Sequence, residues 1–229
     1  MIEIKPAPSI HAVVEVPGSK SYTHRILIAS ALSDGECLIH NRLKSEDTEH
    51  TLKALQQLGV AAEENDFGLK IRGTGGRLKG ESEIFLGNSG TSMRLLTSVA
   101  ALAEGETVLT GTDRMKERPI ADLLNGLIQI GVNARSVNGN GCPPVAVTGG
   151  SLQGGRIALR CGLSSQFLSG LLLIGPYLRE GLEIEVVQGP VSKPYIDLTL
   201  EVMERLGVSV ERSGYERFYV PGNRIFRAG

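Results

Sequence analysis

The sequence predicts an α+β fold in which three repeated β-α-β-α-β-β units place buried helices inside and sheets outside. Three observations predict it. A helix-ending Leu-Gly or Ile-Gly step followed by Val occurs three times, at Gly59, Gly131 and Gly207. Turn glycines recur at nearly the same spacing, at Gly35, Gly105 and Gly181. The first helices of the second and third units, 93–103 and 167–178, are apolar nearly all round, which indicates burial.

Each unit is expected to run in the same order. It opens with a turn rich in Gly, Ser and Thr, and a buried first helix follows. A short strand comes after the turn glycine, and an amphipathic second helix then ends at the Leu-Gly or Ile-Gly stop, where glycine forms the C-cap. Two strands complete the unit.

Several element boundaries follow from this pattern. First helices are expected at 93–103 and 167–178, and second helices at 46–58 and 196–206. The strands after the turn glycines are expected at 37–40, 107–110 and 182–187, and the units close at Gly73, Gly149 and Gly222. A strand-like start, 1–16, and a tail, 223–229, fall outside the repeats.

Composition narrows the class of protein. The chain has 229 residues, 24 Lys and Arg against 25 Asp and Glu, and 41% hydrophobic residues. Plentiful apolar residues and a near-zero net charge exclude a disordered or low-complexity chain. The neutral balance also argues against a nucleic-acid or membrane partner held by bulk charge, and it favours a small ligand.

The sequence shows no metal-binding or disulfide pattern. Cys37, Cys142 and Cys161 are odd in number and widely spaced, which indicates neither a disulfide framework nor a zinc site. His24, His40 and His50 lack the spacing of metal ligands and are interpreted as surface or capping residues. Neither a metal nor a cofactor is therefore expected.

Targeting and membrane segments are not predicted either. Charged residues interrupt the apolar ones in the first 16 positions, unlike the apolar core of a signal peptide. The apolar stretch 167–178 is too short to span a bilayer and contains Ser, Gly and Pro. A cytoplasmic protein is expected, with no membrane and no nucleic acid as partner.

The three opening turns form the candidate site. Pseudo-threefold symmetry would bring them to one end of the domain, where unpaired backbone N–H groups and the helix dipoles favour an anion such as phosphate or carboxylate. The simpler alternative is that the hydroxyl side chains of these turns only cap their helices. Those hydroxyls belong to Ser19, Ser21, Thr91 and Ser164.

Cations near the turns favour anion binding over simple capping. Arg binds carboxylate and phosphate through paired hydrogen bonds, and Lys acts as a mobile point charge. Lys20 is also the candidate for proton transfer, because neighbouring cations favour the neutral amine. The five cations at matching places are Lys20, Arg25, Arg94, Arg118 and Lys193. Five acidic residues are interpreted as helix-terminal charges: Asp47, Glu49, Asp113, Glu117 and Asp197.

Five motifs resemble those of the 5-enolpyruvylshikimate-3-phosphate synthase family. They occur in the family order and extend over the whole chain. They are Pro17-Gly18-Ser19-Lys20-Ser21 with Arg25, Gly87-Asn88-Ser89-Gly90-Thr91 with Arg94, Glu117-Arg118-Pro119-Ile120, Ser164-Ser165-Gln166-Phe167, and Ser192-Lys193-Pro194-Tyr195-Ile196-Asp197. The second motif departs from the version with Ala and Pro, since Ser89 and Leu95 stand at those positions.

The resemblance implies the enolpyruvyl transferase fold, an inside-out α/β barrel of two similar three-unit domains with ligands in the cleft between them. The chain resembles about the first half of that fold. Residues 1–16 would form a strand belonging to the second, absent domain. Residues 17–222 would form the three-unit substrate-binding domain, and residues 223–229 the crossover to the absent domain.

The reaction implied by the resemblance transfers the enolpyruvyl group of phosphoenolpyruvate to the 5-hydroxyl of shikimate 3-phosphate and releases phosphate. It belongs to the shikimate pathway, which leads to chorismate and the aromatic amino acids. The full-length protein would be a cytoplasmic monomer without a cofactor. The partners of this chain would be the two substrates and the missing second domain, and the chain alone would be inactive.

The resemblance also implies roles for individual residues. Lys20 would take part in proton transfer, and Gly90 would be where the inhibitor glyphosate fits tightly. Shikimate 3-phosphate would be bound by Lys20, Ser21, Arg25, Ser164, Ser165, Gln166, Ser192, Lys193 and Tyr195. Phosphoenolpyruvate would be bound by Lys20, Gly90, Arg118 and Gln166, with Asn88, Thr91 and Arg94 as supporting residues.

Two alternatives stay open. The related UDP-N-acetylglucosamine enolpyruvyl transferase has the same fold and chemistry, but it would show a Lys-Asn pair near the start and a reactive loop cysteine. Ser19-Lys20-Ser21 and Cys142, which precedes two prolines, argue against it. The other alternative is a non-catalytic anion-binding module of the same fold, which would suit half of a cleft that binds without turnover.

Overall fold

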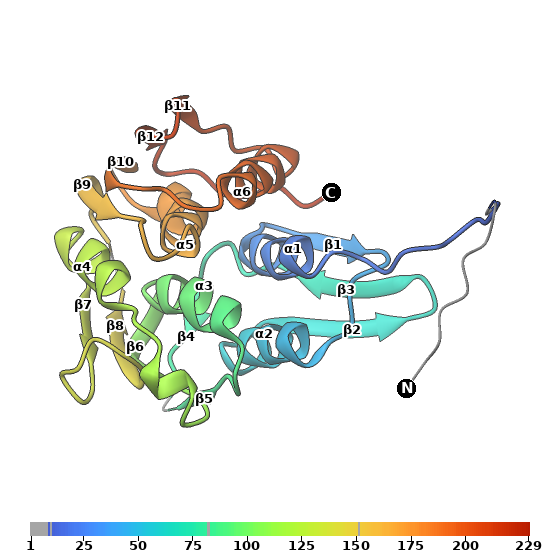
Figure 1. Cartoon of the computed structure of the whole chain (residues 1–229), viewed down its shortest axis with the longest axis horizontal. Helices are drawn as coiled ribbons and strands as arrows, with labels where there is room; N and C mark the ends of the chain where they lie inside the picture. Colours follow the sequence, from blue (N-terminus) through green and yellow to red (C-terminus); the bar gives the residue numbers. More distant parts are fainter. Residues whose placement is uncertain (1–8, 10, 82, 151) are drawn as a thin grey trace.

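Helices and strands alternate along the chain in three similar series (Figure 1). The computed structural model describes residues 9, 11–81, 83–150 and 152–229. The α-helices are α1 (Lys20–Leu32), α2 (Glu46–Gln57), α3 (Gly90–Ala100), α4 (Ala121–Gln129), α5 (Gln166–Ile174) and α6 (Pro194–Arg205). Two short 3-10 helices, η1 (Met115–Glu117) and η2 (Gly175–Tyr177), lie before α4 and after α5.

The strands of each series form a separate sheet. They are β1 (Glu36–Ile39), β2 (Ala61–Asn65), β3 (Gly68–Arg72), β4 (Leu78–Lys79), β5 (Ile84–Phe85), β6 (Ala103–Thr110), β7 (Asn133–Ser136), β8 (Val145–Gly149), β9 (Gly155–Arg160), β10 (Leu182–Gln188), β11 (Glu211–Ser213) and β12 (Arg217–Val220). The strand orders are β1-β3-β2, then β4-β6-β8-β7 with β5 also on β6, then β11-β12-β10-β9. β4 and β5 pair in parallel with β6, and β9 with β10, whereas the other pairs are antiparallel.

The predicted repeat is complete in the second and third series only. In the first series, the described residues contain no strand before α1, so β1 lacks the parallel neighbour that β6 and β10 have. β5 lies against α2, and β9 lies against α4. At the equivalent place between β1, α1 and α6 there is instead a cavity of about 450 Å³, lined by Ile26, Leu38 and Leu198 among others.

The first helices are buried, as the sequence predicts. Residues 167–174 of α5 are all buried, and so are residues 95–100 of α3. α3 packs against both α1 and α5, while α2, α4 and α6 lie around these three helices and the sheets lie outside. The amphipathic prediction for α2 is also confirmed, because Leu52 and Leu55 are buried and Lys53 and Gln56 are exposed.

Two predicted helix ends were placed too late. α3 ends at Ala100, because β6 begins at Ala103 and pairs there with β4. α5 ends at Ile174, where Gly175 forms the C-cap and the chain continues as η2. Pro176 has no backbone N–H with which to continue the α-helical ladder.

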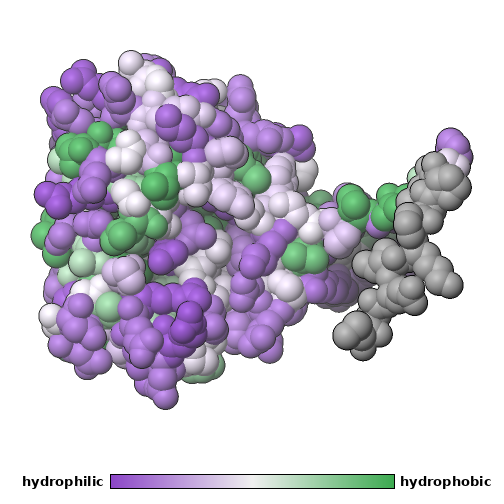
Figure 2. Space-filling view, in the orientation of Figure 1, coloured by the Kyte–Doolittle hydropathy of each residue, from purple (hydrophilic) through white to green (hydrophobic). Residues whose placement is uncertain are grey.

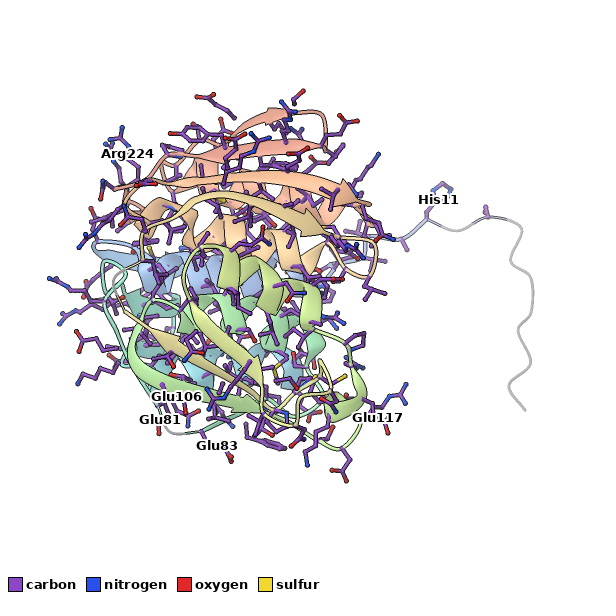
Figure 3. The ribbon with its side chains drawn as sticks, turned by 90° about the vertical axis from the view of Figure 1, so that its left-hand side faces the viewer. His11, Glu81, Glu83, Glu106, Glu117 and Arg224 are labelled. Atoms are coloured by element: carbon purple, nitrogen blue, oxygen red, sulfur yellow. The ribbon has the colours of Figure 1, made fainter. Side chains whose placement is uncertain are left out.

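The two segments outside the repeats differ in their packing. Residues 9 and 11–16 form no helix or strand; they stand away from the body, as the position of His11 in Figure 3 shows. The predicted strand 1–16 otherwise lies outside the described residues. The valines of this extension are exposed and form the apolar patch at the right of Figure 2. In contrast, Phe226 of the tail is buried and packs edge-on against Tyr177.

The turn glycines Gly105 and Gly181 provide a matched test of the fold. Both have positive φ, +88° and +72°, but only Gly181 is crowded, by the backbone oxygen of Val220 and the backbone nitrogen of Gly222. We expect Gly105→Ala to lower the free energy of unfolding by about 1 kcal/mol through backbone strain alone. Gly181→Ala should cost about 2 kcal/mol more, because main-chain atoms must move. Urea unfolding measures both, and equal losses would contradict the predicted crowding.

Candidate functional site

Hydrogen bonds join the N-terminal ends of four helices in two pairs, α1 with α2 and α3 with α5. Lys20 at the start of α1 donates to the Asp47 carboxylate in the first turn of α2, at 3.0 Å. Gln166 at the start of α5 donates to the Thr91 hydroxyl of α3 at 2.9 Å and accepts from Arg94 at 3.0 Å. Because these helix ends meet, their dipoles and free N–H groups favour an anion at this end of the domain.

Asp47 has a second role that the sequence did not indicate. It lies in the first turn of α2, as expected of a helix-terminal charge, but it also forms an ion pair with Lys20. The side chains of the two residues are 50% (Lys20) and 32% (Asp47) exposed. Solvent therefore reaches the ammonium group, which is free to exchange the carboxylate for an incoming anion.

Arg94 and Arg118 bring two positive charges close together beside Gly90. A Cβ atom placed on Gly90 would lie 2.5 Å from Nη1 of Arg118 and 3.9 Å from Nη1 of Arg94. Burial, and then the nearby charge of Arg118, lower the pKa of Arg94. Arg118 also donates to the main-chain oxygen of Asn88 at 3.5 Å. Two guanidinium groups facing a helix N terminus form a suitable place for a carboxylate or phosphate.

Arg25 is buried, although the resemblance implies a role in binding substrate. Only 1% of the residue is exposed. Its guanidinium donates to the Thr199 hydroxyl at 2.7 Å, to the Ser169 hydroxyl at 3.1 Å and to the main-chain oxygen of Ser21 at 2.9 Å. Burial lowers its pKa to about 10. Here Arg25 ties α1 to α5 and α6.

The remaining predicted residues lie at the starts of α5 and α6. Ser164 and Ser165 are buried, and the Ser164 hydroxyl accepts from the backbone N–H of Gln166 at 3.2 Å. Tyr195 is 46% exposed and close enough to Arg25 to affect its titration. Ser192 is exposed and has a φ of +55°.

Lys193 differs from the other predicted residues. Its ammonium lies 5.0 Å from the centre of the Tyr215 ring, in the turn between β11 and β12. Tyr215 in turn donates to the Asp197 carboxylate at 2.6 Å. Among the described contacts, Lys193 therefore faces this hairpin and not the other predicted side chains.

The interpretation of His24 as a surface or capping residue was wrong. His24 lies in the middle of α1 and is fully buried. Its Nδ1 atom lies 2.7 Å from the Thr51 hydroxyl, and its Nε2 atom is buried without a hydrogen-bond partner. Burial lowers its pKa to about 4; Asp47 opposes this effect, and Arg25 and Lys20 add to it.

Four hydroxyl residues in this region were missed by the sequence analysis: Thr51, Ser92, Ser169 and Thr199. All four are fully buried and contact one another in pairs across helices. One sequence signal marks two of the four, because Thr51 and Thr199 each stand eight positions before a helix-stop glycine. Aligning the repeats on that glycine would have shown these two threonines at equivalent positions.

Neither a metal centre nor a membrane span is seen in the described part of the chain. No group of three or more His, Cys, Asp or Glu residues there is placed to hold a metal ion. Within the same ranges, no helix has the length and apolar character needed to cross a bilayer.

Comparison with known proteins identifies one family. The family model described as EPSP synthase (3-phosphoshikimate 1-carboxyvinyltransferase) matches residues 4–229. A relative named 3-phosphoshikimate 1-carboxyvinyltransferase from Sulfurovum sp. (strain NBC37-1) is 42% identical over 231 residues, covering 99% of this chain and 54% of the relative. A chloroplastic relative of the same name from Petunia hybrida is 40% identical over 239 residues, covering 99% and 46%.

Solved structures agree with the sequence relatives. The structure of EPSP synthase from Acinetobacter baumannii has a TM-score of 0.83 and 30% identity; the match covers 94% of this chain and 48% of that one. The predicted fold class is thus confirmed as that of the enolpyruvyl transferases. The chain spans about half the length of the curated relatives it matches.

Gly90 offers a test of the cationic pocket. A methyl group at this position would displace the flexible end of Arg118 and leave the backbone in place. We expect Gly90→Ala to change the free energy of unfolding by less than about 1 kcal/mol. Phosphate-ion affinity should fall about fivefold, the equivalent of one hydrogen bond. The control is Arg118→Ala: the double variant should bind no more weakly than either single variant, and additive losses would exclude a shared pocket.

His24 predicts a pH dependence of stability. Its pKa is about 4 when folded and 6.5 when unfolded, so the unfolded chain binds more protons between these values. The stability contributed by this group is therefore fully present above pH 6.5 and is lost progressively as the pH decreases below that value. We expect a loss of about 2 kcal/mol between pH 7 and pH 5. Urea unfolding should show this slope in wild type and in the exposed-site control His40→Asn. The same slope in His24→Asn would contradict the assignment.

Proposed function

Because the chain belongs to the EPSP synthase family, we propose that it supplies the shikimate 3-phosphate-binding half of a 3-phosphoshikimate 1-carboxyvinyltransferase. The reaction transfers the enolpyruvyl group of phosphoenolpyruvate to the 5-hydroxyl of shikimate 3-phosphate. One observation supports this proposal above the others: the helix N termini meet at one end, together with Lys20, Arg94 and Arg118.

Electrostatics explain why the reaction needs such a site. Both substrates are polyanions, so bringing the 5-hydroxyl to phosphoenolpyruvate requires their mutual repulsion to be neutralised. In the first step, the hydroxyl oxygen forms a bond to C2 of phosphoenolpyruvate, its proton leaves, and C3 gains a proton. In the second step, the C2–O bond to phosphate breaks and C3 loses a proton, which gives the enol ether and phosphate.

The proposed roles follow the geometry of the site. Lys20 is half exposed and adjacent to the substrate face, which supports a role in proton transfer. Gly90 leaves room beside the Arg118 guanidinium for the carboxylate or phosphate of phosphoenolpyruvate, and Arg94 holds Gln166 in position. The inhibitor glyphosate, which also carries a carboxylate and a phosphonate, would compete for this space.

Shikimate 3-phosphate would lie across the starts of α1, α5 and α6. Its proposed partners include Lys20, Ser21, Arg25, Ser164, Ser165, Gln166, Ser192, Lys193 and Tyr195. Since the Arg25 guanidinium is enclosed, its role would be exerted mainly through its contacts with Ser21 and through its charge. Lys193 would have to leave the Tyr215 ring to reach the phosphate.

The remaining parts of the machinery are also proposals. A second domain would close over this face and supply the groups that the described face does not contain, and the complete protein would act as a monomer. The proposed compartment is the cytoplasm, which suits three cysteines that are all free. The relative from Petunia hybrida is named as chloroplastic.

Isothermal titration of the 229-residue chain with shikimate 3-phosphate tests this proposal. Saturable binding is expected, and shikimate, which lacks the phosphate, should bind at least about tenfold more weakly because a charged contact is lost. Similar affinities for both compounds would contradict a phosphate-recognising face. No binding at all would show that the isolated chain does not form the site.

Arg25→Ala should weaken the binding of shikimate 3-phosphate by roughly 1.5 to 3 kcal/mol, because its positive charge and the charged hydrogen bond that holds Ser21 are lost. Arg205→Ala is the matched control, since Arg205 is an exposed cation on α6 that pairs with Glu201. Circular dichroism first confirms that both variants are folded. Unchanged affinity in Arg25→Ala would refute its assignment.

Turnover is not expected from this chain alone. Mixing the chain with both substrates should release no phosphate above the uncatalysed rate, because the chain spans only about half the length of its relatives. A phosphate-release assay checks this expectation. Ready product formation would show that the groups on the described face are sufficient for catalysis.

A further inference from the structure

His24 begins a chain of buried polar contacts that the proposed function does not use. Its Nδ1 atom lies 2.7 Å from the Thr51 hydroxyl of α2. The Thr51 hydroxyl lies 2.8 Å from the Ser92 hydroxyl of α3, and Ser92 donates to the main-chain oxygen of Asp47 at 3.0 Å. All three side chains are fully buried, so solvent does not take part.

The direction of each hydrogen bond in this chain is assigned from its far end. The Ser92 hydroxyl lies within 3.0 Å of the Asp47 main-chain oxygen, the Thr51 hydroxyl and the Ser89 hydroxyl. Of these three, only the main-chain oxygen cannot donate, so the single proton of Ser92 is assigned to Asp47. The 2.8 Å contact between Thr51 and Ser92 then needs the proton of Thr51, because otherwise two oxygens would face each other without a hydrogen. Thr51 has no second proton, and therefore His24 must donate from Nδ1.

The neighbouring residue Arg25 heads a second chain of the same design. It donates to Ser169 and Thr199, and Thr199 donates to the main-chain oxygen of Tyr195 at 2.8 Å. Thr199 stands four residues after Tyr195, just as Thr51 stands four residues after Asp47. A guanidinium can only donate, so the direction of this chain is certain. His24 stands at the head of the first chain, as Arg25 stands at the head of the second, although the hydroxyl that donates to Asp47 belongs to Ser92 and not to Thr51.

We infer that His24 is a positioning residue: as the neutral Nδ1–H tautomer, it fixes the first turn of α2 through Thr51 and Ser92, and so fixes the carboxylate that pairs with Lys20. The same chain holds Ser89, which lies 2.6 Å from Ser92 and caps α3 immediately before Gly90. One buried imidazole thus aligns the Lys20 side and the Gly90 side of the site. This role in catalysis rests on the proposed function, but the tautomer does not.

The tautomer is tested by NMR on the chain labelled with 15N-histidine at pH 7. The His24 resonances are identified by their loss in His24→Asn. We expect Nδ1 in the protonated range and Nε2 in the unprotonated range. In Thr51→Val, which removes the acceptor, this signature should be lost to tautomer averaging. A protonated Nε2 with a bare Nδ1, or averaging in wild type, would overturn the inference.

The positioning role is tested by amide hydrogen exchange and by titration with shikimate 3-phosphate. Ser92→Ala should accelerate exchange in the first turn of α2 and weaken binding about fivefold, as the loss of one hydrogen bond would. The matched control is Ser98→Ala, because Ser98 is a buried hydroxyl of the same helix without a hydrogen-bond partner. His24→Leu should behave like Ser92→Ala, whereas His24→Asn, which keeps a donor near Nδ1, should recover most of the affinity.

Failure of this inference can be told apart from failure of the proposed function. If wild type binds and Ser92→Ala binds equally well, the positioning role is wrong. If wild type does not bind shikimate 3-phosphate, the proposed function of the isolated chain fails. The exchange rates in Ser92→Ala and Ser98→Ala then decide the positioning role alone, and equal rates in α2 would overturn it.

Discussion

The burial of α1, α3 and α5 side by side is the constraint on which the other features of this domain depend. Their apolar faces are satisfied by packing, but each helix start leaves backbone N–H groups and polar side chains that need hydrogen-bond partners. The partners come from neighbouring helix starts, as in the contact of Gln166 with Thr91 and Arg94. The anion site is therefore a consequence of the packing of the buried helices, which brings their N-terminal ends together.

The three helix interfaces meet this constraint in two ways. Hydroxyl pairs join α2 to α3 and α5 to α6, at Thr51 with Ser92 and at Thr199 with Ser169. In α4 the position eight residues before the stop glycine holds Leu123, which is fully buried. The interface of α4 is therefore apolar at this position. The three units share the same helix arrangement, but the residues at equivalent positions differ in polarity. The two polar interfaces are the ones that α1 also contacts, through His24 and Arg25.

The repeat, the buried helices and the meeting of the opening turns could all be predicted from the sequence, because glycine spacing and apolar faces are local properties. The pairing of Lys20 with Asp47 could not, since it depends on how far α2 rotates against α1. The burial of His24 was missed for a related reason. A single histidine in a helix shows its environment only when the neighbouring hydroxyls are aligned across repeats, and the helix ends at Ala100 and Ile174 depend on strand pairing and on Pro176.

The division of polar groups between buried and exposed ones determines how the site can work. Arg25 and His24 are buried and held by hydrogen bonds, so their side chains lose little conformational entropy when an anion binds. Lys20 and Tyr195 are about half exposed and keep the mobility needed to exchange partners. Because the buried hydrogen bonds are already formed, these residues reorganise little when the anion binds. Only a few exposed side chains then lose conformational entropy on binding. The buried hydrogen-bonded residues thus hold the site in a fixed geometry, while the exposed side chains can move to contact the substrate.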